Sequence, residues 1–340
     1  MSSSYTGKAV RIPRAGGPDV LEITDYTAAE PGGTDVLVQV AAAGLNRADL
    51  LQRRGQYPAP AGVPSDIPGL EYAGTVIAVG PGVTSRRVGD RVMGIVGGGA
   101  MATHVTVNER ETIAIPDGMA FDVAAAIPEV FLTAFDALFL QGDLKLGETV
   151  LIHAVGSGVG TAAIQLARVA GARVAGTSRS KEKLERCRTL GLDHPIFVDN
   201  DGRFAGEISA DLILDCVGAG YLAENLRALA PRGRLVCIGT LSGGKGELPL
   251  GMLLGKRATV IGSVLRSRPL EEKAALARRF EREVLPLFIR SPGRPGASPA
   301  EATPALTPVL TSTLPMSRIA EAHALMEADQ TFGKTVLTWS

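Results

Sequence analysis

The sequence predicts an α/β protein of two domains, one rich in β-strands and one built on a parallel sheet with helices on both faces. The chain has 340 residues, more than one ordinary hydrophobic core contains. Its pattern changes near Ala134. Short strand-like segments broken by Gly and Pro come before this point, and apolar strands alternating with helices come after it.

The first part, residues 1 to about 127, has the pattern of an antiparallel, barrel-like domain. Residues 36–45 (VLVQVAAAGL) alternate between inward and outward positions, as a strand with one buried face does. Residues 71–82 and 88–95 combine apolar stretches with the dense Gly and Pro signals of tight turns.

The second part has the pattern of a parallel sheet. Apolar segments predict strands at 149–155, 172–178, 195–199, 210–218, 234–240 and 258–265. Helices are predicted between them, at 158–171, 181–191 and 221–233. Buried strands separated by helices imply a sheet that is covered on both faces.

The C-terminal part begins with an amphipathic helix, predicted over residues 271–288. Residues 291–305 (SPGRPGASPAEATPA) lack periodicity and predict a flexible surface insertion. The tail, 317–340, reads as a helix followed by a strand that is expected to return to the first domain.

Composition excludes several classes of protein. The 35 basic and 35 acidic residues balance, which leaves no electrostatic footprint for nucleic acid or an anionic membrane. No apolar run approaches the roughly 18 residues of a membrane span, and the first ten residues lack the apolar core of a secretory signal. The three cysteines, Cys187, Cys216 and Cys237, make a disulfide framework improbable and favour a cytoplasmic location.

The sharpest local motif lies between the first predicted strand and helix of the second part. Gly158, Gly160 and Ala163 match G-x-G-x-x-A, in which the glycines permit a tight turn and close approach of a pyrophosphate. The following helix offers free N–H groups and the positive end of its dipole. We therefore expect a dinucleotide to bind at Gly156, Ser157, Gly158, Val159 and Gly160.

The end of the next strand discriminates between the two nicotinamide cofactors. NAD enzymes carry an acidic residue there that binds the ribose 2′-hydroxyl. This chain has Ser178 and Arg179 at that point, with Lys181 and Lys183 just beyond them. Ser178, Arg179 and Lys183 are predicted to bind a 2′-phosphate, which makes NADPH the expected cofactor.

With these residues in view, the chain resembles the medium-chain dehydrogenase/reductase superfamily. Within it, the chain is most similar to the p53-inducible branch of the zinc-free NADPH:quinone oxidoreductases. The matching stretches are 44–57, 68–76, 124–138, 151–167, 212–218, 253–268 and 320–334. The resemblance implies a GroES-like catalytic domain (residues 1–128 and 266–340), a Rossmann domain (129–265) and a homodimer.

The resemblance also implies that no metal is bound. Zinc-dependent relatives have a Cys and a Gly-His-Glu motif where this chain has Asn46 and Gly69-Leu70-Glu71. The four histidines are scattered singly, whereas tetrahedral zinc needs several N or S ligands at suitable spacing.

Without a metal, hydride transfer depends on how the protein orients the nicotinamide and the acceptor. Asn46 and Tyr57 fall in the segment that lines the substrate pocket of similar enzymes, and they are the candidate catalytic residues. Tyr57 is the candidate proton donor. Asp49 could equally be a helix cap, and Arg47, Arg53 and Arg54 are expected to be solvated.

The resemblance assigns further residues to the cofactor. They are Glu129 and Thr133 near the nicotinamide, Val217, Gly218, Gly239, Ser263 and Leu265 after successive strands, and Lys334 in the tail. Relatives often have Tyr near the end of the third strand, where this chain has Val198, and this departure weakens the argument for NADPH.

The sequence therefore predicts hydride transfer from NADPH to a quinone or related acceptor. Two alternatives remain open. An enoyl or acryloyl (enone) reductase would use the same scaffold, and an NADPH-binding sensor or RNA-binding protein would show little turnover.

Overall fold

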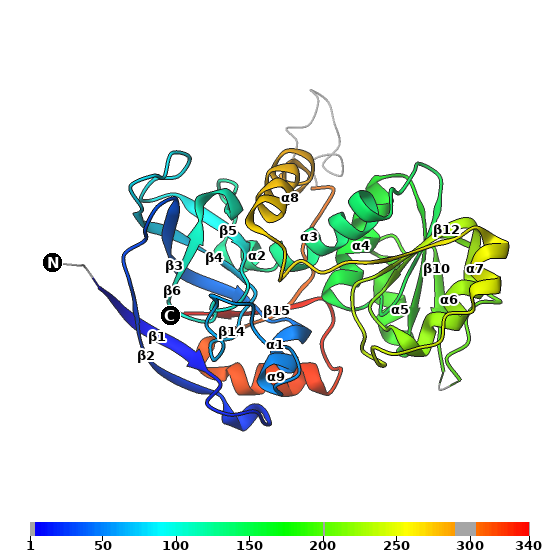
Figure 1. Ribbon diagram of the computed structural model, residues 1–340, viewed down its shortest axis with the longest axis horizontal. Coiled ribbons are helices and arrows are strands. Elements are labelled where there is room, and N and C mark those ends of the chain that lie inside the picture. The colour runs from blue at the N-terminus through cyan, green and yellow to red at the C-terminus, as the bar shows by residue number, and fades with distance from the viewer. Residues whose placement is uncertain (1–3, 200, 290–303, 340) are drawn as a thin grey trace. The chain divides into compact units, whose positions relative to one another are not determined.

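The computed structural model describes residues 4–199, 201–289 and 304–339 (Figure 1). The chain divides into two compact units. Among the described residues, the first contains those up to Leu132, then Leu265–Ile289 and those from Pro308 on, and the second contains Thr133–Val264 with 304–307. Most of the predicted insertion, 291–303, lies outside the described residues.

The first unit is built on a mostly antiparallel sheet with the order β14-β15-β3-β4-β5-β7, in which β6 also pairs with β3. The strands are β3 (Asp35–Gly44), β4 (Glu71–Val79), β5 (Arg91–Ile95), β6 (His104–Asn108), β7 (Ile113–Ala114), β14 (Leu310–Pro315) and β15 (Lys334–Thr338). A separate antiparallel pair joins β1 (Tyr5–Arg11) to β2 (Glu22–Ala28). The tail strand β15 therefore returns to the first unit, as the sequence predicts.

Alternating apolar residues of β3 explain why this sheet forms. Val36, Val38 and Val40 pack in one buried cluster with Tyr72 and Val76 of β4. Gly74 of β4 pairs with β3, and a Cβ on it would lie 2.1 Å from the Gln39 carbonyl oxygen, so only glycine fits there. The helices of this unit are α1 (Arg47–Arg53), α2 (Phe121–Ala125), α8 (Leu270–Glu283) and α9 (Ile319–Glu327), and α3 (Pro128–Phe135) leads into the second unit.

The second unit is built on a parallel sheet with the order β10-β9-β8-β11-β12-β13. The strands are β8 (Thr149–Ile152), β9 (Arg173–Ser178), β10 (His194–Phe197), β11 (Ala210–Asp215), β12 (Leu229–Cys237) and β13 (Thr259–Gly262). The helices are α4 (Gly158–Val169), α5 (Lys181–Arg188), α6 (Leu222–Ala228) and α7 (Leu250–Lys256). This order is that of the doubly wound Rossmann fold, which confirms the predicted fold class.

Several predicted element bounds are wrong. The helix predicted over 221–233 ends at Ala228, and β12 begins at Leu229, because Pro231 cannot continue a helix and Arg232 has a φ of 66°. The helix predicted over 271–288 ends at Glu283, before a 3-10 turn that contains Pro286. The strand predicted over 149–155 ends at Ile152.

The structure buries one side chain that the sequence predicts to be solvated. Arg53 was expected to be solvated, but its side chain is fully buried: it donates to the Gly16 carbonyl oxygen at 3.0 Å and contacts His323 and Glu327 of α9. The packing of α1 against α9 causes this burial.

None of the described helices is both long and apolar enough to cross a bilayer.

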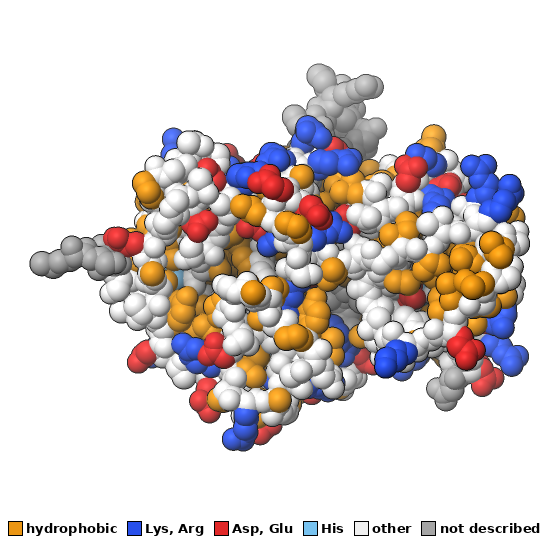
Figure 2. Space-filling model, in the orientation of Figure 1, with side chains coloured by type: hydrophobic (Ala, Val, Ile, Leu, Met, Phe, Trp, Pro, Cys, Tyr) orange, Lys and Arg blue, Asp and Glu red, His pale blue; other side chains and the backbone are white. Residues whose placement is uncertain are grey.

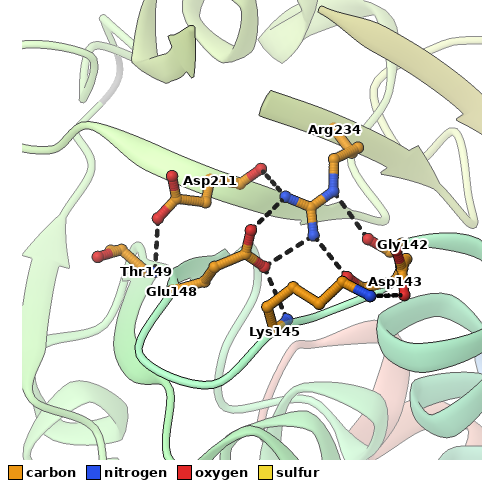
Figure 3. Close-up of polar contacts among 7 residues, drawn as sticks. All are labelled: Gly142, Asp143, Lys145, Glu148, Thr149, Asp211 and Arg234. Atoms are coloured by element: carbon orange, nitrogen blue, oxygen red, sulfur yellow. Dashed lines mark hydrogen bonds and ion pairs between the residues drawn. The ribbon is translucent and has the colours of Figure 1, made fainter. Parts of the chain in front are cut away.

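An arginine network ties together the amino ends of three strands in the second unit (Figure 3). Arg234 of β12 forms two hydrogen bonds of 2.8 Å with the Glu148 carboxylate, which precedes β8. It also donates to the carbonyl oxygens of Gly142, Asp143 and Asp211. All five guanidinium N–H donors are thereby used, and the loop before β8 is fixed to β11 and β12.

Candidate functional site

The G-x-G-x-x-A turn forms the start of α4, directly after β8. The side chain of Ser157 caps the helix by accepting from the Gly160 N–H at 3.1 Å. A Cβ on Gly160 would lie 2.5 Å from the Val155 carbonyl oxygen, so glycine is required for the turn to close. The first N–H groups of α4 point out of the helix with no acid in its first turn, which fits an anion such as a pyrophosphate.

The residues predicted for the 2′-phosphate lie at the end of β9 and the start of α5. Arg179 is exposed, while Ser178 and Lys183 are partly buried. Ser178 Oγ accepts from the Ser180 N–H at 3.1 Å, and Val198 is buried in the core of this unit. No carboxylate follows the end of β9 before Glu182, so this end of the strand carries positive charge.

A buried network fixes the turn that follows β11. The Asp215 carboxylate accepts from the N–H groups of Val217 at 2.6 Å and Gly218 at 3.1 Å, and from the Asn225 side chain at 3.0 Å. Asn225 in turn accepts from His153 Nε2 at 2.6 Å, and His153 Nδ1 contacts Thr177 Oγ1 at 2.8 Å. Burial raises the pKa of Asp215 to about 6 and lowers the pKa of His153 to about 4, so His153 is neutral near pH 7.

Two of the predicted glycines, Gly218 and Gly239, lie at this turn, and Ser263 follows β13. Gly218 has a φ of 87°, and a Cβ there would lie 2.8 Å from Thr240 Cα. Gly239 packs against the Cys216 backbone. Ser263 Oγ donates to the Asp136 carboxylate at 2.8 Å. Asp136 directly follows α3, the helix that contains Thr133. The predicted residues that follow the strands of the second unit thus lie at the carboxyl ends of those strands, where open α/β sheets bind ligands.

In the first unit, the predicted residues Asn46, Glu129 and Lys334 meet around Glu71. The Lys334 ammonium donates to Glu71 Oε1 at 2.5 Å, Asn46 Oδ1 at 2.8 Å and the Leu45 carbonyl oxygen at 2.8 Å. Asn46 Nδ2 donates to Glu71 Oε1 at 2.9 Å, and the Glu129 N–H donates to Glu71 Oε2 at 2.8 Å. Both Glu71 and Lys334 are buried. The three protons of Lys334 are therefore held by protein groups.

Two further carboxyl groups lie near this cluster. Asp49 accepts from the N–H groups of Asn46 and Gly69, so it caps α1 as the sequence allowed. Burial raises the pKa of Asp49 to about 6. Burial, reinforced by the Glu71 charge, raises the pKa of Glu129 to about 8, which makes Glu129 a neutral acid near pH 7.

Tyr57 lies in the loop after α1 and is partly buried. Its ring faces the guanidinium of Arg266, whose Cζ is 4.6 Å from the ring centroid. Leu265, predicted for the cofactor, is buried next to Arg266 in the first unit.

Sequence reasoning missed Glu71, Arg266 and the Asp215–Asn225–His153 network as parts of the site. In the sequence, Glu71 stands out only as the Glu of Gly69-Leu70-Glu71, where zinc-dependent relatives have Gly-His-Glu. Arg266 could have been noticed as a basic residue that directly follows the last predicted strand, 258–265. Nothing in the sequence pairs Asn225 with His153.

The described part of the chain contains no group of three or more His, Cys, Asp or Glu side chains that could hold a metal ion. Beside Asn46, the positive charge is the Lys334 ammonium.

The chain matches two family descriptions. "Alcohol dehydrogenase GroES-like domain" matches residues 32–117, and "Zinc-binding dehydrogenase" matches residues 158–281. A quinone oxidoreductase of Pseudomonas aeruginosa is 39% identical over 270 residues, which cover 77% of this chain and 81% of that protein.

Solved structures are similar over nearly the full length. A quinone oxidoreductase of Pseudomonas syringae is 30% identical with a TM-score of 0.82, over 98% of this chain and 99% of that one. A mycobacterial protein complexed with NADPH is 29% identical with a TM-score of 0.80, and the CurK enoyl reductase is 28% identical with a TM-score of 0.81. Both alignments cover 98% of this chain and 99% of the other.

Proposed function

Because this chain belongs to the zinc-free quinone oxidoreductase family of the medium-chain dehydrogenases and reductases and is an oxidoreductase, we propose that it transfers hydride from NADPH to a quinone. The observation that carries this proposal is the carboxyl edge of the parallel sheet. The glycine turn at the start of α4 and the acid-free, basic end of β9 lie on that one edge.

Different residues of the chain are proposed to bind the different parts of the cofactor. The turn before α4 and the first residues of that helix, from Gly156 to Gly160, hold the pyrophosphate, and Ser178, Arg179 and Lys183 hold the 2′-phosphate. The turn at Val217 and Gly218 supports the nicotinamide end, and the buried Asp215 carboxylate holds the shape of that turn. Gly239, Ser263 and Thr133 of the second unit are proposed to line the same end, and Glu129 and Leu265 of the first unit are proposed to contact the cofactor.

In the first unit, Asn46 and Tyr57 are proposed to contact the acceptor. When bound, the cofactor supplies the hydride, and the protein supplies orientation and a proton. Tyr57 gives its phenolic proton to the acceptor oxygen. Lys334 and Glu71 hold the Asn46 amide in one orientation, since both of its polar atoms are hydrogen-bonded to them. The resemblance assigns Lys334 to the cofactor; because Glu71, Asn46 and the Leu45 carbonyl oxygen hold its three protons, we propose that it positions Asn46 instead.

Turnover with a panel of acceptors tests this function. We expect NADPH oxidation by 1,4-benzoquinones and naphthoquinones to exceed oxidation by enals and enones in kcat/KM. The opposite order would favour the enoyl reductase alternative, which the similarity to the CurK enoyl reductase supports. NADPH binding without turnover of any acceptor would contradict both enzymatic functions and favour a sensor or RNA-binding role.

Replacing Tyr57 with Phe should lower kcat by roughly tenfold to a hundredfold with enones and less with quinones, because one proton donor contributes about 10²–10⁴-fold at most. A quinone needs the donor less, since water can protonate its reduced oxygens. The KM for NADPH should not change. Unchanged kcat with both acceptor classes would make Tyr57 a packing residue.

NADPH should be preferred over NADH by roughly tenfold to a hundredfold in kcat/KM, equivalent to about 1.5–3 kcal/mol. The preference is modest because Arg179 is solvated and Val198 offers no hydroxyl group. It should shrink as salt rises. The double substitution Arg179→Ala and Lys183→Ala should remove most of the preference and leave NADH kinetics nearly unchanged.

Arg186 and Arg188 provide the control, because they are exposed on the last turn of the same helix. Their replacement by Ala removes the same charge but should leave the preference intact. Equal kcat/KM for the two cofactors in the unmodified protein would show that the basic residues only begin a helix.

We also propose that the protein is a homodimer in the cytoplasm. β13 is the last strand in its sheet, so within the described chain one of its edges has no partner strand. The helix α7, which precedes β13 in the chain, packs only Met252 and Leu253 partly against the core, and Leu250 and Leu254 are 61% and 75% exposed. Figure 2 shows hydrophobic side chains gathered over α7. A second copy that paired along β13 would cover this apolar surface.

Leu254→Glu should therefore weaken the dimer by at least a hundredfold in dissociation constant, because a buried unpaired charge costs several kcal/mol. Sedimentation velocity over a range of concentrations measures this. Leu146→Glu is the matched control, since Leu146 is 85% exposed in the loop before β8. Dissociation of both variants to the same extent would contradict the assignment to α7 and β13.

A further inference from the structure

Arg266 is a buried cation that anchors three segments of the first unit. Its side chain follows β13 and is only 8% exposed. Nε donates to the Gly97 carbonyl oxygen at 2.7 Å, Nη2 to Gln52 Oε1 at 2.6 Å and Nη1 to the Tyr57 carbonyl oxygen at 3.1 Å. The guanidinium therefore holds α1, the Tyr57 loop and the loop at Gly97 in one arrangement.

All three hydrogen-bond acceptors of Arg266 are neutral. The acidic side chains that raise the pKa of Arg266, Asp49 and Glu129, do so through their charge and not through a hydrogen bond. Within the described chain, no carboxylate forms an ion pair with it, whereas Arg53, Arg234 and Lys334 each have one. A buried charge normally has such a partner, because desolvation is costly. The positive charge of Arg266 is thus not neutralised by direct contact.

The Arg266 guanidinium lies over the face of the Tyr57 ring. The guanidinium carbon lies 4.6 Å from the ring centroid, within the range of a cation–π interaction. Burial raises the pKa of the Tyr57 phenol, the Arg266 charge opposes that rise, and the Glu129 charge adds to it. A phenol in an apolar pocket is a reluctant proton donor, and a nearby cation makes it a better one by stabilising the phenolate.

We propose that Arg266 is the positioning residue of Tyr57, which fixes the ring and stabilises the phenolate left behind when the acceptor oxygen takes the phenolic proton. In that step the O–H bond of Tyr57 breaks, an O–H bond forms on the acceptor, and solvent later returns a proton to the phenolate. This inference rests on the proposed function, because it assumes an acceptor that needs a proton.

The test measures Tyr57 directly as well as through turnover. The absorbance of phenolate near 295 nm is titrated in the unmodified protein and in Arg266→Gln and Arg266→Lys. Subtracting the same titration of Tyr57→Phe isolates Tyr57 from the other tyrosines, of which the chain has four. We expect the pKa of Tyr57 to rise in Arg266→Gln and to stay closer to its original value in Arg266→Lys, which keeps the charge.

Turnover of an enone should fall roughly tenfold to a hundredfold in Arg266→Gln, with an unchanged KM for NADPH. In a Tyr57→Phe background the same substitution should have little further effect, because the two residues act as one unit. Arg268→Gln is the matched control: Arg268 lies two residues along, pairs with Glu272 and should leave both readouts unchanged.

An unchanged pKa of Tyr57 in Arg266→Gln, or additive losses in the double variant, would overturn the inference. If Arg266→Gln fails to fold by circular dichroism, Arg266→Lys decides: the inference requires that it retain most of the pKa effect. No turnover of any acceptor by the unmodified protein would overturn the proposed function instead, and the phenolate titration would still test the coupling of Arg266 to Tyr57.

Discussion

Lys334→Met should lower the free energy of unfolding of the first unit by about 3–5 kcal/mol. The substitution keeps the length of the side chain and removes its charge. The Glu71 carboxylate then stays buried without a cation, and Asn46 Oδ1 and the Leu45 carbonyl oxygen lose their donor. Removing one member of a buried, hydrogen-bonded pair leaves an uncompensated charge, which costs more than the pair itself contributes.

The single tryptophan makes this measurable. Trp339 lies directly after β15 in the first unit, so its fluorescence in a urea titration reports on that unit. Lys8→Met is the matched control: Lys8 forms an ion pair with Asp25 in which both side chains are largely exposed, and its loss should change stability by less than about 1 kcal/mol. Equal, small effects of both substitutions would show that the Lys334–Glu71 pair is not a major source of stability.

Arg234→Met should destabilise the second unit by roughly 3 kcal/mol. Three backbone carbonyl oxygens and the partly buried Glu148 carboxylate lose their donors together, and the loop before β8 is released from β11 and β12 (Figure 3). Arg234→Lys should recover only part of the loss, because an ammonium cannot form the two parallel bonds to Glu148.

Differential scanning calorimetry measures the change in Tm. Arg227→Met is the control, since Arg227 is more exposed and has Glu224 as its ion-pair partner. The network lies at the amino ends of the strands, whereas the proposed cofactor residues follow the carboxyl ends. NADPH affinity below the melting transition should therefore be unchanged. A loss of affinity larger than the loss of folded protein would contradict a purely structural role.

Local patterns predicted much of the second unit. The apolar strands, the glycine turn and the missing acid at the end of β9 depend on residues close together in the sequence, and their geometry follows from backbone requirements. Gly160 illustrates this, because the turn closes only without a Cβ. The errors also have local causes. Pro231 ended a helix early, and α7 was missed because it is short and two of its leucines, Leu250 and Leu254, stay exposed, so that it shows little of a buried face.

Only the tertiary structure decided which charged side chains are buried and what they contact. Lys334 and Glu71 are 263 residues apart, Arg266 and Tyr57 are 209 apart, and Arg53 and Glu327 are 274 apart. Arginine and lysine are usually solvated, so the sequence favoured that state for Arg53. A buried cation is stable only where acceptors from distant segments surround it. That condition is met only when α9, the tail strand β15 and the segment after β13 pack into the first unit, and no local pattern contains that information.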